Sequence, residues 1–205
     1  MKTLFCFVTA FAAMAGTAFA DALEGKRAPA EIIESAAAND WRDVDPAQVM
    51  VIDLERGRVT IELSDVFAQA HVAQMKTLAK AGFYNGLSFY RVIDGFVAQG
   101  GDPFETKELP DGAIKGLKAE FDIAAAASEV EKGELADFTL GENDGYANSV
   151  GWRRGFALGR QKINGESRYH LLHCTGAIAM ARDIEKDTGG TEFYITLQPQ
   201  RYLDR

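Results

Sequence analysis

The chain has few of the residues that build metal centres, disulfide frameworks and redox sites: its 205 residues include two cysteines and three histidines. It contains no paired Cys-x-x-Cys motif, no phosphate-binding P-loop and no Gly-x-Gly-x-x-Gly turn after a strand. The histidines, His71, His170 and His173, do not stand with carboxylates at the spacing of metal ligands. The sequence therefore predicts no metal site and no cofactor.

Positive charge is also in deficit, with 22 lysines and arginines against 30 aspartates and glutamates and a net charge of −8. Such a chain is unsuited to nucleic acid or to anionic membrane surfaces. Its hydrophobic content of 47% is sufficient for a sizeable core. A length of 205 residues fits one domain with some elaboration.

A long apolar run is present only at the N-terminus. Lys2 precedes an apolar stretch over residues 4–15, and Ala18-Phe19-Ala20 has the small-x-small pattern of a cleavage site. The stretch is too short to span a bilayer comfortably. Residues 1–20 are thus expected to be a signal peptide cleaved after Ala20, which predicts a periplasmic or secreted protein with no membrane span. An uncleaved anchor is the alternative.

Removal of the signal peptide would take Cys6 with it and leave Cys174 alone, so no internal disulfide is expected. Apolar neighbours such as Leu172 favour a buried, inert Cys174, and a reactive thiol is the alternative. The adjacent His173 suggests a thiol protease, but no orienting third group or glycine-rich turn supports one.

The periodicity along the chain indicates a mainly β fold. Residues 21–48 form an N-terminal extension with a short helix over 31–38. Strands are expected over 49–54 and 59–63 as a hairpin, and apolar residues at helical spacing predict a helix over 66–81.

Two further strands are expected over 87–93 and 96–100. The order strand, strand, helix, strand, strand favours a closed barrel plugged by helices over a repeated β-α-β unit.

The most informative segment is FYNGLSFYRVIDGFVAQGGDP, residues 83–103. Strand alternation places Phe89, Arg91 and Ile93 on one face. Gln99 and a Gly-Gly-Asp turn follow. A surface with one cation, one amide and several aromatic rings suits a mostly apolar substrate whose carbonyl group must be held.

This segment resembles the signature of the cyclophilin-type peptidyl-prolyl cis-trans isomerases. Residues 176–182, 188–195 and 202–204 also resemble segments of that family, and the resemblance covers about 49–121 and 175–205. It implies a cyclophilin-like closed antiparallel β-barrel with capping helices over residues 49–205. It also implies an enzyme that needs no cofactor and accelerates rotation about X-Pro bonds in exported proteins, with proline-containing polypeptides as substrates.

The resemblance also assigns roles within the site. Arg91 matches the family's catalytic arginine, with Phe96 and Gln99 beside it; a surface salt bridge from Arg91 to Asp94 or Glu192 is the alternative. Contact with substrate is implied for a second set of residues: Val97, Ala181, Glu192, Tyr194, Tyr202 and Leu203.

The chain departs from the family pattern in several places. Residues 122–170 are expected to be an insertion, and the family's final strand, expected after Arg205, is missing, which suggests a fragment or a truncated reading frame. Tyr90, Val97, Glu192 and Tyr194 stand where histidine, methionine, glutamine and phenylalanine are common. These changes predict reduced activity or altered preference in a monomeric enzyme, or alternatively a peptide-binding or scaffold module with little catalysis.

Overall fold

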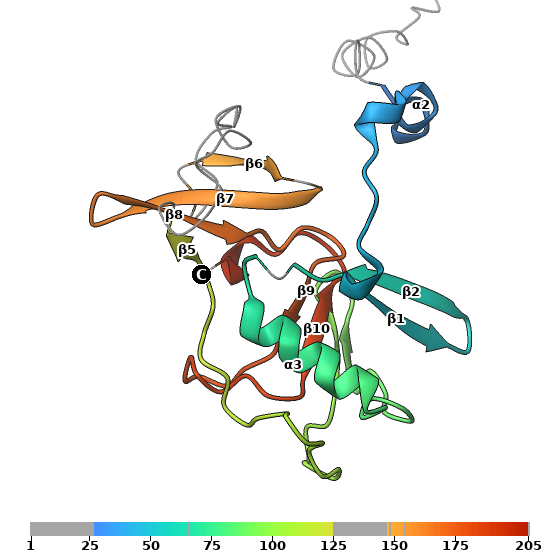
Figure 1. Cartoon of the computed structure of the whole chain (residues 1–205), viewed down its shortest axis with the longest axis vertical. Coiled ribbons are helices and arrows are strands. Elements are labelled where there is room, and N and C mark those ends of the chain that lie inside the picture. Colours follow the sequence, from blue (N-terminus) through green and yellow to red (C-terminus); the bar gives the residue numbers. More distant parts are fainter. Residues whose placement is uncertain (1–26, 65, 125–146, 148, 154, 205) are drawn as a thin grey trace, which may run out of the picture. The chain divides into compact units, whose positions relative to one another are not determined.

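The computed structural model describes residues 27–64, 66–124, 147, 149–153 and 155–204 (Figure 1). The chain divides into two compact units, Met1–Asp43 and Val44–Arg205. The expected signal peptide lies outside the described residues. Within the described ranges, no helix has both the length and the apolar character to cross a membrane.

The first unit contains helix α2 (Pro29–Ser35) and the short 3₁₀-helix η1 (Ala38–Asp40). Pro29 lies at the start of α2. Backbone N–H groups in this position have no acceptor within the helix, so the N–H that proline lacks costs the helix no hydrogen bond. The Glu31 carboxylate accepts a hydrogen bond from the backbone N–H of Ala28 at 2.9 Å and so caps the helix. The helix predicted over 31–38 is confirmed, although it begins and ends earlier.

The second unit begins with 3₁₀-helix η2 (Pro46–Gln48) and an antiparallel hairpin of β1 (Val49–Leu54) and β2 (Gly57–Glu62). Met50 and Ile61 lie directly opposite each other in this hairpin, and both are buried. Directly opposed residues on one face pack together, so this pair anchors the hairpin in the core. The predicted hairpin is confirmed.

Helix α3 (Gln69–Lys80) buries the apolar positions Val72, Met75 and Leu78, whose spacing predicts the helix. Gly82, with a φ of 68°, ends it. The N-cap residue Ala68 has no side-chain oxygen with which to cap the helix. The Glu120 carboxylate, distant in sequence, instead accepts hydrogen bonds from the first backbone N–H groups of α3.

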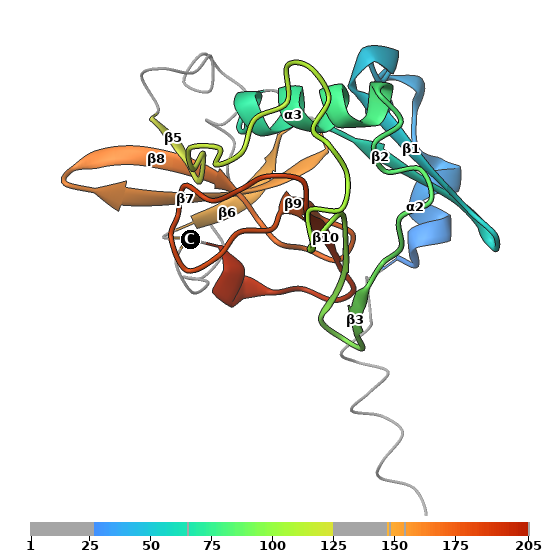
Figure 2. The same cartoon turned by 90° about the horizontal axis from the view of Figure 1, so that it is seen from below.

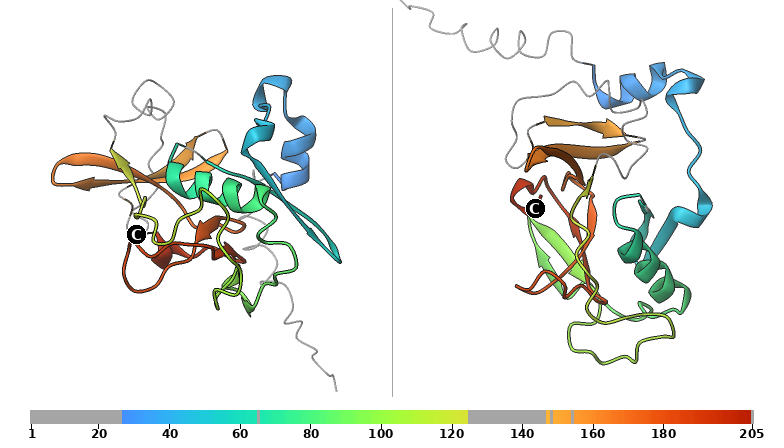
Figure 3. Two further views of the ribbon diagram at one scale, coloured as in Figure 1. Left: turned by 60° about the horizontal axis from the view of Figure 1, so that its bottom comes forward. Right: turned by 60° about the vertical axis from the view of Figure 1, so that its left-hand side comes forward.

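The central sheet has the strand order β3-β4-β10-β9, and every neighbouring pair is antiparallel. Its strands are β3 (Arg91–Ile93), β4 (Val97–Gly100), β9 (Ile178–Met180) and β10 (Phe193–Thr196). One face carries Phe193, Met180 and Ile195 and packs against α3 and the β1–β2 hairpin (Figure 3). Residues 87–90, predicted as part of a strand, lie outside β3.

A second four-stranded sheet, ordered β5-β8-β7-β6, is formed within the predicted insertion (Figure 1). Its strands are β5 (Ile123–Ala124), β6 (Ser149–Arg153), β7 (Phe156–Ile163) and β8 (Glu166–Leu171). Leu158 on β7 and Tyr169 on β8 form a separate buried cluster with Phe67. No strands were predicted in this region from the sequence.

A short 3₁₀-helix, η5 (Arg201–Leu203), precedes Asp204, the last described residue. The prediction of a mainly β protein with few helices is confirmed. The predicted closed barrel is not: the described strands form one two-stranded and two four-stranded sheets. Because β3 and β9 each pair with one strand only, the central sheet has two open edges among the described residues.

Candidate active site

The central sheet places three predicted site residues in one row across its strands. Gln99 on β4 lies directly opposite Arg91 on β3 and opposite Tyr194 on β10. Opposed residues of neighbouring strands point to the same face, and successive residues point to opposite faces. The row therefore lies on the face that points away from Phe193 and the α3 core.

Arg91 is held by contacts within this face. Its Nη1 donates to Gln99 Oε1 at 3.0 Å, and its guanidinium carbon lies 5.6 Å from the centre of the Phe96 ring. Among the described residues these contacts, and not a salt bridge to Asp94 or Glu192, hold the side chain. A guanidinium keeps its charge at any physiological pH and has five donors, so it still offers donors beyond this contact.

The Gln99 amide is held from both ends. Its oxygen accepts from Arg91, while its Nε2 donates to the Tyr90 hydroxyl and, at 3.1 Å, to Glu192 Oε2. The Tyr90 hydroxyl in turn donates to Glu192. Partial burial and the neighbouring Glu192 carboxylate raise the pKa of Tyr90, which keeps this hydroxyl protonated. Both amide hydrogens of Gln99 therefore have partners within the protein.

Aromatic and aliphatic side chains form the apolar part of the site. Phe96 stacks on Tyr202 with ring centres 5.8 Å apart, and Val97 is almost fully buried at 2% exposure. The β3–β4 turn is tied to the segment after β10 (Figure 2): the backbone N–H of Leu197 donates to Phe96 O, and Gln200 Nε2 donates to Gly95 O, each at 2.8 Å. These bonds hold Phe96 beside η5.

A cavity of about 1020 Å³ is lined by most of the predicted residues and also by core residues of the other face of the sheet, such as Met75 and Phe193. Its lining includes every predicted site residue except Glu192. Ala181 lies just after β9, where its backbone N–H donates to Glu192 O at 2.9 Å. The predicted contact between the Ala181 backbone and a substrate stays a prediction.

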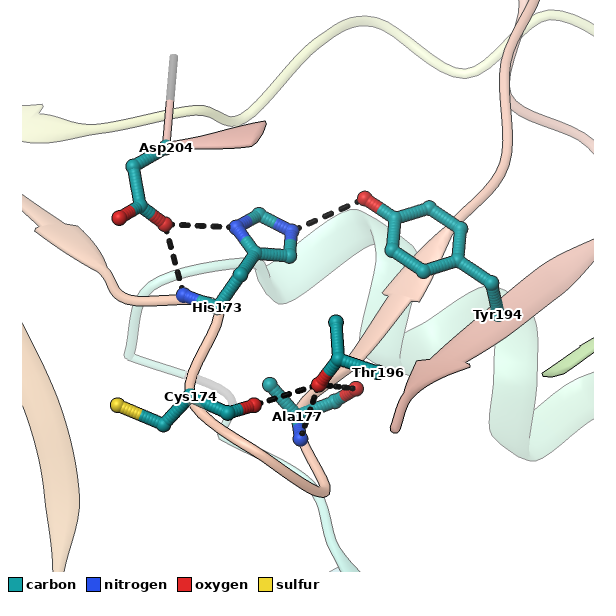
Figure 4. Close-up of polar contacts among 6 residues, drawn as sticks. All are labelled: His173, Cys174, Ala177, Tyr194, Thr196 and Asp204. Atoms are coloured by element: carbon teal, nitrogen blue, oxygen red, sulfur yellow. Dashed lines mark hydrogen bonds and ion pairs between the residues drawn. The ribbon is translucent and has the colours of Figure 1, made fainter. Parts of the chain in front are cut away.

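Two residues of this region were not predicted from the sequence: His173 in a binding role, and Asp204. His173 Nε2 lies 2.9 Å from the Tyr194 hydroxyl, and His173 Nδ1 lies 2.8 Å from Asp204 Oδ1 (Figure 4). The signal in the sequence was Tyr194 itself, because a tyrosine in place of phenylalanine brings a hydroxyl that needs a partner when buried. Both ring nitrogens of His173 thus have partners other than Cys174, whose thiol pKa is raised by burial, so the pair has no protease geometry.

Comparison with known sequences assigns the chain to a family. Residues 49–205 match the profile of the family described as cyclophilin type peptidyl-prolyl cis-trans isomerase/CLD. The chain belongs to the cyclophilin family. Peptidyl-prolyl cis-trans isomerase B of Bacillus subtilis is 31% identical over 152 residues, which cover 74% of this cyclophilin and 73% of the Bacillus protein.

Other relatives match over shorter segments. A probable peptidyl-prolyl cis-trans isomerase of Brucella suis is 48% identical over 58 residues, 28% of this cyclophilin and 30% of the Brucella protein. This match thus spans about a third of that relative. The crystal structure of the cyclophilin AquaCyp293 from Hirschia baltica superposes with a TM-score of 0.64 at 27% identity, covering 83% of this chain and 67% of that one.

Proposed function

We propose that this cyclophilin accelerates cis–trans rotation about X-Pro bonds in polypeptides. The observation that carries the proposal is the Arg91 guanidinium, held 3.0 Å from Gln99 Oε1 and beside the apolar surface of Phe96. Family membership supports the same activity. The uncatalysed rotation has a barrier of about 20 kcal/mol and takes tens of seconds or longer.

The obstacle to rotation is amide resonance, so no covalent bond has to break. An enzyme lowers the barrier by binding the twisted amide more tightly than either planar form. As the amide twists, the prolyl nitrogen becomes pyramidal and gains a lone pair that a nearby cation stabilises. Arg91 supplies that cation, Phe96 and the neighbouring apolar residues hold the proline ring, and Gln99 orients the arginine.

The substrates proposed are proline-containing segments of exported proteins, and the chain acts as a monomer outside the cytoplasm. The signal-peptide pattern of residues 1–20 supports export. We also propose that the central sheet closes into the antiparallel barrel implied by the family resemblance. The open edges at β3 and β9 are where further pairing can occur.

A peptide-binding module with little catalysis is the second candidate function. The observation in its favour is that both amide hydrogens of Gln99 are used by Tyr90 and Glu192, so fewer donors remain to hold a substrate carbonyl. Such a site still offers an apolar surface and one cation to a proline-containing peptide.

Isomerisation of Ala-Pro peptides, followed by NMR exchange or a protease-coupled assay, separates the two candidates. We expect catalysis by the wild type and a loss of about 100-fold or more in kcat/KM for Arg91→Ala, because one positioned charge is removed from the transition state. Arg58→Ala is the matched control, since Arg58 forms an exposed ion pair with Asp53 in the β1–β2 hairpin. Full activity in a folded Arg91→Ala would reject the mechanism, and peptide binding without turnover in the wild type would favour the binding module.

A further inference from the structure

A second polar chain reaches the site face from the side opposite Arg91. Asp204 Oδ1 accepts from the backbone N–H of His173 at 2.7 Å and lies 2.8 Å from His173 Nδ1. His173 Nε2 lies 2.9 Å from the Tyr194 hydroxyl, and the two rings are nearly parallel at 16° (Figure 4). Asp204 is 4% exposed. The three side chains thus form a continuous path from a buried carboxylate to the candidate site.

The hydrogen-bond partners determine the tautomer of the neutral imidazole. A carboxylate only accepts hydrogen bonds, so His173 Nδ1 carries the proton that faces Asp204. His173 Nε2 is then an acceptor, and the Tyr194 hydroxyl donates to it. Burial, the largest effect, raises the pKa of Tyr194 to about 12, so this hydroxyl keeps its proton throughout the neutral range. With its proton directed to His173, the hydroxyl offers only oxygen lone pairs to the site.

Protonation of His173 reverses the last bond of this path. Both ring nitrogens are donors in an imidazolium, so Nε2 donates to the Tyr194 oxygen. The hydroxyl proton then takes the other in-plane position, away from His173. Tyr194 lies opposite Gln99 and lines the same cavity as Arg91. The phenol can therefore serve the site as a hydrogen-bond acceptor in one state and as a donor in the other.

We propose that Tyr194 is a specificity-determining residue of the substrate site and that His173 and Asp204 are positioning residues that set its hydrogen-bonding role. Proline has no N–H, so the X-Pro amide itself offers a carbonyl acceptor and no donor. The donor state of Tyr194 can bind such a carbonyl and the acceptor state cannot. This inference rests on the proposed isomerase function. It adds a polar contact between Tyr194 and the substrate, and the strength of that contact depends on the protonation of His173.

Other titratable groups also act on this path and enter the interpretation of any pH profile. Those facing His173 and Tyr194 from the surrounding elements are Asp204, His170, Cys174, Arg182 and Tyr202. Arg182 is the cation in this set; its guanidinium lies 5.4 Å from the Phe121 ring centre and donates to the carbonyl groups of Asp183 and Ile184.

The first test follows kcat and KM for an Ala-Pro peptide from pH 5 to pH 8, the range in which histidine side chains change charge. We expect kcat/KM of the wild type to be about fivefold higher at pH 5, mainly through KM, as one hydrogen bond predicts. Tyr194→Phe lacks the hydroxyl, and His173→Gln keeps a partner for it but does not titrate; both should lose this dependence. His71→Gln is the control that should keep it, because His71 pairs with Glu120 at the start of α3.

The second test needs no turnover. Long-range ¹H–¹⁵N correlation spectra at pH 8 identify the tautomer of His173, and we expect the proton on Nδ1. A proton on Nε2 overturns the proposal, as does a flat pH profile in a folded wild type or a profile unchanged in Tyr194→Phe. Absence of isomerase activity at every pH would refute the proposed function, and the tautomer alone would then decide for or against the path from Asp204 to Tyr194.

Discussion

Replacing Glu192 with glutamine should make this cyclophilin a better catalyst. In the structure the Glu192 carboxylate accepts from Gln99 Nε2 at 3.1 Å and from the Tyr90 hydroxyl. Gln99 therefore keeps both amide hydrogens within the protein instead of offering one to a substrate carbonyl. The carboxylate also places a negative charge near Arg91, whose positive charge stabilises the twisted amide in the proposed mechanism.

The size of the effect follows from the kind of hydrogen bond that is lost. A hydrogen bond to a charged group contributes about 1.5–3 kcal/mol, and one between neutral groups contributes about 0.5–1.5 kcal/mol. Glu192→Gln thus lowers the free energy needed to release the Gln99 amide by about 1 kcal/mol, or about fivefold in an equilibrium constant. We expect kcat/KM to rise by about this factor.

The assay is the Ala-Pro exchange measurement, with thermal unfolding measured in parallel. Asp94→Asn is the matched control: Asp94 lies in the turn between β3 and β4, near Arg91 in sequence, but it is not a partner of Gln99 among the described contacts. A gain in Glu192→Gln that Asp94→Asn does not share would assign the effect to Gln99. An unchanged or lower kcat/KM in a folded Glu192→Gln would refute the reasoning.

Three predictions concern stability. Burial lowers the pKa of His170 below 6.5, so the unfolded state binds more protons than the folded state. The free energy of unfolding should therefore fall as pH drops through about 6.5. Urea titrations at pH 5 and 7 should show this loss of stability, and His170→Leu should reduce it. Glu120→Ala leaves the first N–H groups of α3 without their acceptor and should lower the free energy of unfolding by about 1–2 kcal/mol. An unchanged urea midpoint would contradict this capping role of Glu120. Gly101→Ala should lower the free energy of unfolding by about 2 kcal/mol or more in the same titration, because φ is 119° and an added Cβ would lie 2.7 Å from Thr191 O. A variant as stable as the wild type would show that the backbone adapts.

The sequence was most informative in segments that combine regular hydrophobic spacing with chemically distinctive residues. Helical spacing of Val72, Met75 and Leu78 predicts α3, and alternation predicts the strand that carries Arg91. The predicted face was wrong for Phe89, which lies outside β3 and packs against Phe193 on the opposite side of the sheet. The strands of 122–170 could not be predicted in the same way. β7 and β8 pair through a short turn, but their burial pattern is irregular, and alternation alone does not identify such strands.

The sequence by itself determined the family, the hairpin and helix α3, and it predicted Arg91, Phe96 and Gln99 as the catalytic set, because each depends on neighbouring residues or on one continuous motif. Only the tertiary structure decided which groups complete the site. Gln99 on β4 meets Glu192 just before β10, and Asp204 reaches His173 from just after η5. These pairings depend on strand register and on the return of the chain after β10, which residue types and spacing do not specify.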